Sequence, residues 1–275
     1  MQRCLVLILA FAGSLLSIGE QTAQPAARTT GPSHFDGWTL SQKEQFLLTA
    51  RIDHENYASK GITHSRKATL TNGRVSHAAH IQTIDVHLPL FKGKDGFEER
   101  DFTDSWKYNV AAYRLAKLLH LAYMVPVCVE REIDGQRTAV DWWADGVLMD
   151  EKERITRNIT PPDVPAWNRQ MATIRLFDQL IYNMDRSQEN LLITTTWNVF
   201  MIDHTRAFRK WRTLRDASAI TQCNPGLLRS LKALNRRDLD RELSSLLTAE
   251  QIDSLLLRRD LIVEKLQSKS TAAYR

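Results

Sequence analysis

Cysteine is scarce in this sequence, with three cysteines in 275 residues. Cys4 lies in the N-terminal apolar stretch, which leaves Cys128 and Cys223 for the rest of the chain. One pair of cysteines is not a disulfide framework, and two cysteines alone cannot form a structural zinc site. The sequence leaves open whether Cys128 and Cys223 form a disulfide bond or remain free thiols.

Long apolar runs are absent after the first 20 residues. The segment MQRCLVLILAFAGSLLSIGEQ contains a basic Arg3, an apolar run from Leu5 to Leu16 and then small residues, a pattern typical of a cleaved secretory signal. We expect a signal peptide at 1–19 and a flexible linker at 20–37. An uncleaved anchor is the alternative, although the run is short for a membrane span. No later segment could span a membrane, so we expect export to the periplasm or the extracellular space, or to the secretory lumen in a eukaryote.

A strong charge of one sign is also absent. The formal net charge is +5, a mild excess that favours acidic partners. Basic residues gather in RAFRKWRTLR at 206–215, which could bind an acidic acceptor or form an ordinary solvated segment. Because no RNA- or DNA-binding motif accompanies this cluster, we expect no nucleic-acid partner.

Local patterns predict a β-rich first half. Asn72 and Gly73 form a strong tight-turn signal, which predicts strands near 67–71 and 76–86. A loop is expected over PLFKGKDGFEERDF, directly after these strands.

A helix and two further strands follow this loop in the prediction. We expect Asp104 to cap the helix, because apolar residues recur after it at helical spacing. VPVCVERE at 125–132 alternates and is rich in β-branched residues, which predicts a strand. Gly135 then turns the chain into a second strand that ends near Trp143.

The second half is mainly helical in pattern. After Pro161, Pro162 and Pro165, one helical face collects apolar side chains from Trp167 to Ile181. Further helices are predicted toward the C-terminus. The order of elements therefore predicts an α+β fold, with a small antiparallel β lobe containing one helix at 38–145 and a larger helical lobe at 146–275.

Between the long helix and the later helices, residues 183–208 read NMDRSQENLLITTTWNVFMIDHTRAF. The apolar segments LLIT and NVFMI predict a hairpin around a turn at 195–198. Asp185 precedes the first segment, Asn190 lies five positions later and Asp203 ends the second segment. Because polar groups are costly to bury alone, these three either lie in solvent at strand ends or converge on a charged ligand.

The spacing of Asp185 and Asn190 is that of D-x-x-x-x-N in the kinase catalytic loop, and Asp203 stands where the Asp of D-F-G stands. With its apolar flanks, the stretch resembles the atypical kinase-like proteins: the HipA kinases, the phosphatidylinositol kinases and the secretory-pathway kinases. The resemblance implies a two-lobed kinase-like fold over 38–265 that binds ATP. It also implies that Asp185 positions or deprotonates the acceptor, and that Asn190 and Asp203 hold Mg²⁺, with Mn²⁺ as the alternative, as oxygen ligands.

The resemblance is weaker in the first half. Gly61 is the one glycine in GITHSRKATL, where the nucleotide-covering loop of kinases has three. Gln82 stands at the position of the usual strand lysine, and Asn109 stands at that of its glutamate partner. Both amides keep hydrogen-bonding capacity without charge, so we expect them to contact phosphate, with Arg66 or Lys67 as a displaced cation. An ordinary polar surface is the alternative for Gln82 and Asn109.

The resemblance implies an exported kinase-like phosphotransferase that moves a phosphoryl group from Mg-ATP to a protein, lipid or small-molecule acceptor. A pseudokinase that binds nucleotide as a scaffold and AMP transfer on the same fold are the alternatives. A metal-dependent hydrolase is disfavoured, because the sequence lacks the extra His or Asp ligands that such a site needs.

Overall fold

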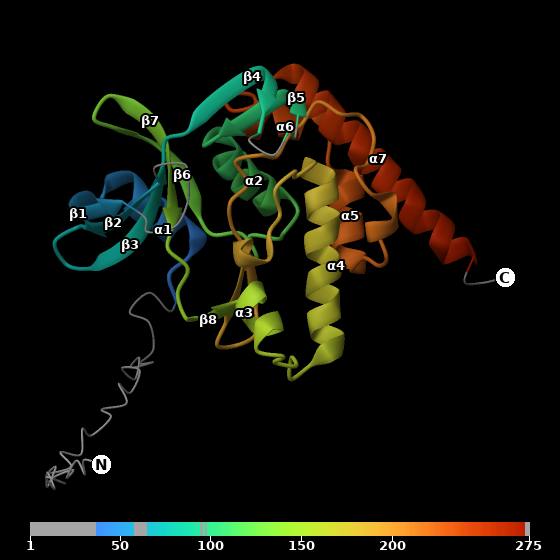
Figure 1. Ribbon diagram of the computed structural model, residues 1–275, viewed down its shortest axis with the longest axis horizontal. Coiled ribbons are helices and arrows are strands. Elements are labelled where there is room, and N and C mark those ends of the chain that lie inside the picture. The colour runs from blue at the N-terminus through green and yellow to red at the C-terminus, as the bar shows by residue number, and fades with distance from the viewer. Residues whose placement is uncertain (1–36, 58–64, 94–95, 97, 273–275) are drawn as a thin grey trace, which may run out of the picture. The chain divides into compact units, whose positions relative to one another are not determined.

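The computed structural model describes residues 37–57, 65–93, 96 and 98–272 (Figure 1). The predicted signal peptide at 1–19, nearly all of the predicted linker at 20–37, and Gly61 lie outside these residues.

The first part of the fold is a five-stranded antiparallel sheet with strand order β1-β2-β3-β7-β6. The predicted turn at Asn72 and Gly73 is confirmed, since Asn72 Oδ1 accepts hydrogen bonds from the backbone N–H groups of Arg74 and Val75, and Gly73 has a φ of +86°. The strands are β1 (Arg51–Tyr57), β2 (Arg66–Thr71), β3 (Ser76–Gln82), β6 (Cys128–Ile133) and β7 (Gln136–Trp142).

Side chains alternate between the two faces of this sheet. One face carries Ala79, Ile81, Val140 and Trp142, which are buried and belong to the hydrophobic core. Phe46 of helix α1 (Leu40–Thr49) packs on this face, with its ring 5.9 Å from that of Trp142. Residues one position away in the strands point to the opposite face, which carries His80 and Gln82 of β3.

In the chain, a separate two-stranded hairpin comes between β3 and the helix of the first part, and Figure 1 shows it at the top of the view. It consists of β4 (Asp85–Lys92) and β5 (Glu98–Ser105), where the sequence predicted a loop. Asp104 therefore belongs to a strand and does not cap the helix. Helix α2 (Lys107–Leu118) begins after Trp106, with no side-chain cap, because the backbone leaves β5 directly into the helix.

The second part is mainly helical, as predicted. The apolar face of α4 is confirmed, since Trp167, Ile174, Phe177 and Ile181 are buried. Helix α7 contacts both α4 and α5 (Figure 1). The elements are β8 (Val147–Asp150), α3 (Glu151–Thr156), α4 (Val164–Ile181), η1 (Gln188–Asn190), β9 (Leu191–Thr194), β10 (Val199–Met201), η2 (Ala217–Ala219), α5 (Pro225–Ala233), α6 (Arg236–Leu243) and α7 (Ala249–Ala272).

A buried arginine joins α7 to the end of α4. Arg258 Nε donates to the Leu180 carbonyl at 2.8 Å, and Nη1 donates to the Arg209 carbonyl at 2.9 Å. Burial lowers the pKa of Arg258 to about 10, which still leaves the guanidinium charged at neutral pH. The contact fixes the point at which the chain leaves α4 for the candidate site.

Both cysteines outside the N-terminal segment are free thiols, Cys128 buried and Cys223 partly exposed. Of the two possibilities that the sequence left open, the structure has the unpaired form. No helix in the described part of the chain is long and apolar enough to cross a membrane.

Candidate active site

The turn after α4 presents Asp185. Helix α4 ends at Ile181, and its C-cap residue Tyr182 has a φ of +51°. Asn183 Oδ1 then accepts the backbone N–H of Asp185 at 3.0 Å. Asn183 is buried and donates to Asp178 Oδ1 at 3.0 Å, so the turn is tied back to the helix. The Asp185 carboxylate itself is 57% exposed, with Arg206 Nη1 at 3.6 Å. A fixed backbone thus carries an accessible carboxylate.

The structure brings Asn190 and Asp203 to the same place as Asp185. Asn190 Nδ2 donates to the Asp185 carbonyl at 3.3 Å, and the Asn190 carbonyl accepts the Ile202 N–H at 3.0 Å. Asp203 follows directly, with a φ of +55° that non-glycine residues rarely adopt. Thr205 Oγ1 donates to Asp203 Oδ1 at 3.0 Å and holds this conformation.

Arg186 joins the segment that carries Asn190 to the segment that precedes Asp203. Its Nη2 lies 3.0 Å from Asp178 Oδ1, in a pair of which both side chains are largely buried. Its Nη1 donates to the Ile202 carbonyl at 2.6 Å and to the Asn190 carbonyl at 3.3 Å. One guanidinium therefore spans α4, the segment before β9 and the segment after β10.

The hairpin β4–β5 contacts the segment that follows Asp203. The Ser105 N–H donates to the Thr205 carbonyl at 2.8 Å, and both Arg206 and Arg209 form ion pairs with Glu99 of β5. Arg209 also donates to the Asp101 carbonyl at 2.9 Å. The hairpin that the sequence did not predict is therefore a supporting element of the site.

A third carboxylate, Asp104 of β5, lies close to this group and was missed as a site residue. Its side chain is nearly inaccessible, and Oδ1 has no hydrogen-bond partner among the described residues. Burial raises the pKa of Asp104, Asp203 and Asp185 raise it further, and Thr205 and Arg206 act in the opposite direction. The sequence offered no signal for Asp104 beyond a capping pattern, because its position depends on the unpredicted strand.

The oxygen donors of this group fit a hard divalent cation. Asn190 Oδ1 accepts no hydrogen bond from the residues that the structure describes, and Asp203 is exposed apart from its contact with Thr205. The described residues contain no cluster of three His, Cys, Asp or Glu side chains that could enclose a metal. Two protein ligands suit Mg²⁺, which usually keeps waters and binds substrate phosphates.

Gln82 and Asn109 both bind backbone groups through their amide oxygens. Gln82 is buried, and its Oε1 accepts the N–H groups of Thr83 at 3.0 Å and Ile84 at 3.3 Å. Asn109 is buried in α2, and its Oδ1 accepts the His204 N–H at 2.8 Å. Gln82 thus supports the end of β3, and Asn109 supports the residue after Asp203. Their predicted contact with phosphate remains a prediction.

The two predicted displaced cations lie on β2 and have partners there. Arg66 Nη1 forms hydrogen bonds of 3.0 and 3.1 Å to the Glu55 carboxylate. Lys67 Nζ lies 4.0 Å from the ring centroid of Trp143, over the ring face. Lys67 is exposed, and it is directly opposite His80 in the β2–β3 pairing.

His80 and Asp141 form a polar pair that the sequence did not indicate. His80 Nδ1 lies 3.1 Å from Asp141 Oδ2, across the β3–β7 pairing. Burial by itself lowers the pKa of His80, but the hydrogen bond and charge of Asp141 and the charge of Asp203 outweigh it, so the pKa is raised. The residues are 61 positions apart, so only the strand pairing reveals them.

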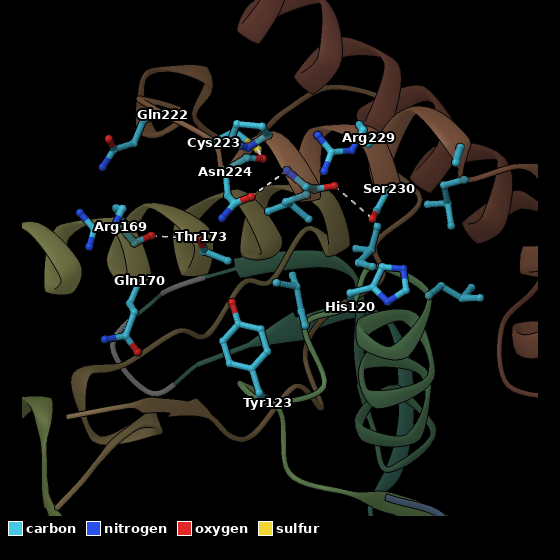
Figure 2. Close-up of a pocket in the computed structure, with 18 of the residues that line it drawn as sticks. His120, Tyr123, Arg169, Gln170, Thr173, Gln222, Cys223, Asn224, Arg229 and Ser230 are labelled. Atoms are coloured by element: carbon cyan, nitrogen blue, oxygen red, sulfur yellow. Dashed lines mark hydrogen bonds between the residues drawn. The ribbon is translucent and has the colours of Figure 1, made fainter. Parts of the chain in front are cut away.

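A cavity of about 970 Å³ lies away from this site (Figure 2). Arg169, Gln170 and Thr173 of α4 line one side, and Asn224 and Arg229 line another. None of the residues predicted for catalysis, nucleotide or metal lines it. It is therefore separate from the group around Asp185 and Asp203.

Comparison with known proteins supports the fold. No protein-family model and no curated protein matches the chain. Among solved structures, hydra Fam20, determined with a sugar, matches with a TM-score of 0.61 and 15% sequence identity, over 83% of this chain and 88% of that chain. The Helicobacter pylori proinflammatory kinase CtkA matches with a TM-score of 0.42 and 10% identity, over 82% of this chain and 98% of that chain. This chain has an atypical protein-kinase-like fold, in which an antiparallel β sheet with a helix precedes a mainly helical part.

Proposed function

We propose that this protein is a kinase-like phosphotransferase that moves a phosphoryl group from Mg-ATP to an acceptor hydroxyl. The observation that carries the proposal is the convergence of Asp185, Asn190 and Asp203, joined by the Asn190–Asp185 hydrogen bond and by the Ile202–Asn190 hydrogen bond beside Asp203. In phosphoryl transfer the protein acts mainly by positioning the reactants and neutralising charge, which such a group can do.

Each of the three residues has a role that its surroundings support. Asp185 is accessible and held by its backbone, so it can orient an acceptor hydroxyl and accept its proton. Asn190 and Asp203 would hold Mg²⁺ or Mn²⁺, which supplies charge neutralisation for the transferred phosphoryl group when ATP is bound. Asp104 offers a further oxygen near Asp203.

The acceptor stays open among a protein, a lipid headgroup and a small molecule. The basic segment 206–215 gives little support for an acidic acceptor, because most of its cations have partners within the fold: Arg206 and Arg209 bind Glu99, and Lys210 lies 3.4 Å from Glu250. We further propose export through the N-terminal segment at 1–19, on its sequence pattern.

Nucleotide binding without transfer is the second candidate function. The observation that favours it is the use of the Gln82 and Asn109 oxygens by backbone N–H groups, in place of a charged lysine–glutamate pair. AMP transfer on the same fold attacks the α-phosphate, whereas phosphoryl transfer attacks the γ-phosphate. A single labelling experiment therefore separates the possibilities.

The test incubates purified protein with γ-labelled or α-labelled ATP and Mg²⁺ or Mn²⁺, beside an Asp203→Ala variant. Label transferred from γ and lost in the variant supports the kinase proposal. Label transferred from α supports AMP transfer. Nucleotide binding with no label from either position supports the scaffold, and no nucleotide binding at all refutes every form of the proposal.

A further inference from the structure

Three strands place a row of charged side chains on one face of the sheet. In the strand pairing, Lys67 of β2 is opposite His80 of β3, and His80 is opposite Asp141 of β7. Because faces alternate along a strand, this row lies on the face opposite the buried Ala79 and Ile81. Phe46 of α1 packs on the other face of the sheet, so the row lies on the face that Phe46 does not cover.

His80 in this row has one ring nitrogen fixed and one available. Nδ1 is engaged by Asp141 at 3.1 Å, while Nε2 has no hydrogen-bond partner among the described residues. The His80 side chain is 29% exposed, so a ligand can reach it. A carboxylate that holds Nδ1–H fixes the ring orientation and stabilises the imidazolium form.

His80 also lies within electrostatic range of Asp203, the expected metal ligand. The two residues come from different parts of the fold, one from β3 and one from the segment after β10, and the charge of Asp203 acts on His80. An anion bound between them, and bridged to Asp203 by a divalent cation, could accept a hydrogen bond from His80 Nε2.

We propose that His80, oriented by Asp141, is the side chain that donates a hydrogen bond to the nucleotide phosphates in place of the strand lysine. The inference rests on the proposed nucleotide site, and it assigns the phosphate contact to His80, while the Gln82 oxygen accepts two backbone N–H groups. A histidine cation held by a carboxylate gives a charge-assisted hydrogen bond to a phosphate oxygen.

The charged and titratable groups around His80 are compatible with this role. Asp141 on β7 pairs with it, Lys67 on β2 lies opposite it in the strand pairing, and the charge of Asp203 raises its pKa. Cys128 on β6 is opposite Asp141, and burial raises its pKa well above the ordinary value, so the thiol remains neutral. His80 thus lies between Lys67 and Asp141 in the strand pairing on this face.

The experiment measures the dissociation constants of Mg-ATP, Mg-ADP and adenosine at pH 6.0 for the wild type, His80→Gln and His80→Lys. The loss of one charge-assisted hydrogen bond corresponds to roughly a tenfold to hundredfold weakening. We expect His80→Gln to weaken ATP and ADP binding by about that factor, with adenosine unchanged. His80→Lys should stay within about threefold of the wild type, because it keeps the cation.

His77→Gln is the matched control. His77 lies on the same strand and is held by Asp145 at 2.9 Å, but its ring stacks on Trp142 at 3.7 Å on the other face of the sheet. We expect it to change thermal stability without changing nucleotide affinity. Thermal melts of all variants confirm that the protein is folded at the assay temperature.

The outcomes separate this inference from the function on which it rests. Unchanged ATP affinity in His80→Gln, with wild-type binding intact, overturns the inference alone. Equal loss in His80→Lys and His80→Gln at preserved fold overturns the charge-based role. Equal loss of adenosine and ATP affinity also overturns it, since the contact would then be with the base. Absence of ATP binding in the wild type overturns both the inference and the proposed function.

Discussion

Replacing Gln82 by lysine restores the residue that the kinase pattern has at this position, yet we expect it to destabilise the protein. The buried Gln82 oxygen accepts two backbone N–H groups, at 3.0 and 3.3 Å, and lysine has no acceptor. An unsatisfied buried N–H costs about 1–3 kcal/mol. Because one of the two bonds is long, we expect Gln82→Met to lower the free energy of unfolding by about 2–3 kcal/mol. Gln82→Lys should lose at least as much, since it also buries a charge.

Urea denaturation monitored by circular dichroism measures these changes in unfolding free energy. Gln136→Met is the control, because Gln136 is exposed at the start of β7 and should change stability by less than about 0.5 kcal/mol. Nucleotide affinity is measured on the same samples. Tighter Mg-ATP binding by Gln82→Lys at unchanged stability would refute the reasoning, because Gln82 would then be a phosphate-facing position.

Three further predictions test other parts of the structure. Arg186→Lys loses the fork that joins Asp178 to two carbonyl groups, so the free energy of unfolding should fall by about 3 kcal/mol in urea titrations, and an unchanged value contradicts the bracing role. The raised pKa of Asp104 means that the folded state holds this proton more tightly, so its contribution to stability falls as pH rises above about 4. Asp104→Asn should therefore have a higher melting temperature than the wild type at neutral pH, and its stability should depend less on pH. Parallel stability–pH profiles of the two proteins would contradict the raised pKa of Asp104. Alkylation of denatured, unreduced protein should modify both Cys128 and Cys223, and mass spectrometry would reveal a disulfide if one forms instead.

The sequence predicted the fold where local signals were strong. The turn at Asn72 and Gly73 placed β2 and the start of β3 correctly, because the turn geometry fixes the register of the flanking strands. The predicted strand at 76–86 was too long, since β3 ends at Gln82 and β4 begins at Asp85. The periodic apolar face predicted α4, because helical periodicity is also a local pattern in the sequence. The hairpin β4–β5 was missed, since most of β4 is exposed and lacks the alternation that marks a half-buried strand. Asp104 was misassigned as a helix cap as a direct consequence.

The residues of the candidate site were likewise predictable only where a local pattern contains them. Asp185, Asn190 and Asp203 lie within 19 residues, so their spacing carries the information that brings them together. The pair of His80 and Asp141 depends on two strands that are distant in sequence, and no local pattern contains it. The engagement of Gln82 by backbone groups is equally invisible before the strand ends are placed.

The central claim is that Asn190 and Asp203 form a metal site for a bound nucleotide, and one titration tests it most directly. Nucleotide binding is measured with and without Mn²⁺ for the wild type and for Asp203→Asn, which keeps the size of the side chain and its contact with Thr205. Outer-shell changes at metal sites cost roughly 10–100-fold in affinity, so loss of a ligand should weaken metal-dependent binding by at least about tenfold. The account predicts tight binding by the wild type with Mn²⁺ and this loss in the variant. Equal affinity of the two proteins, or binding by the wild type that does not depend on the cation, would contradict it.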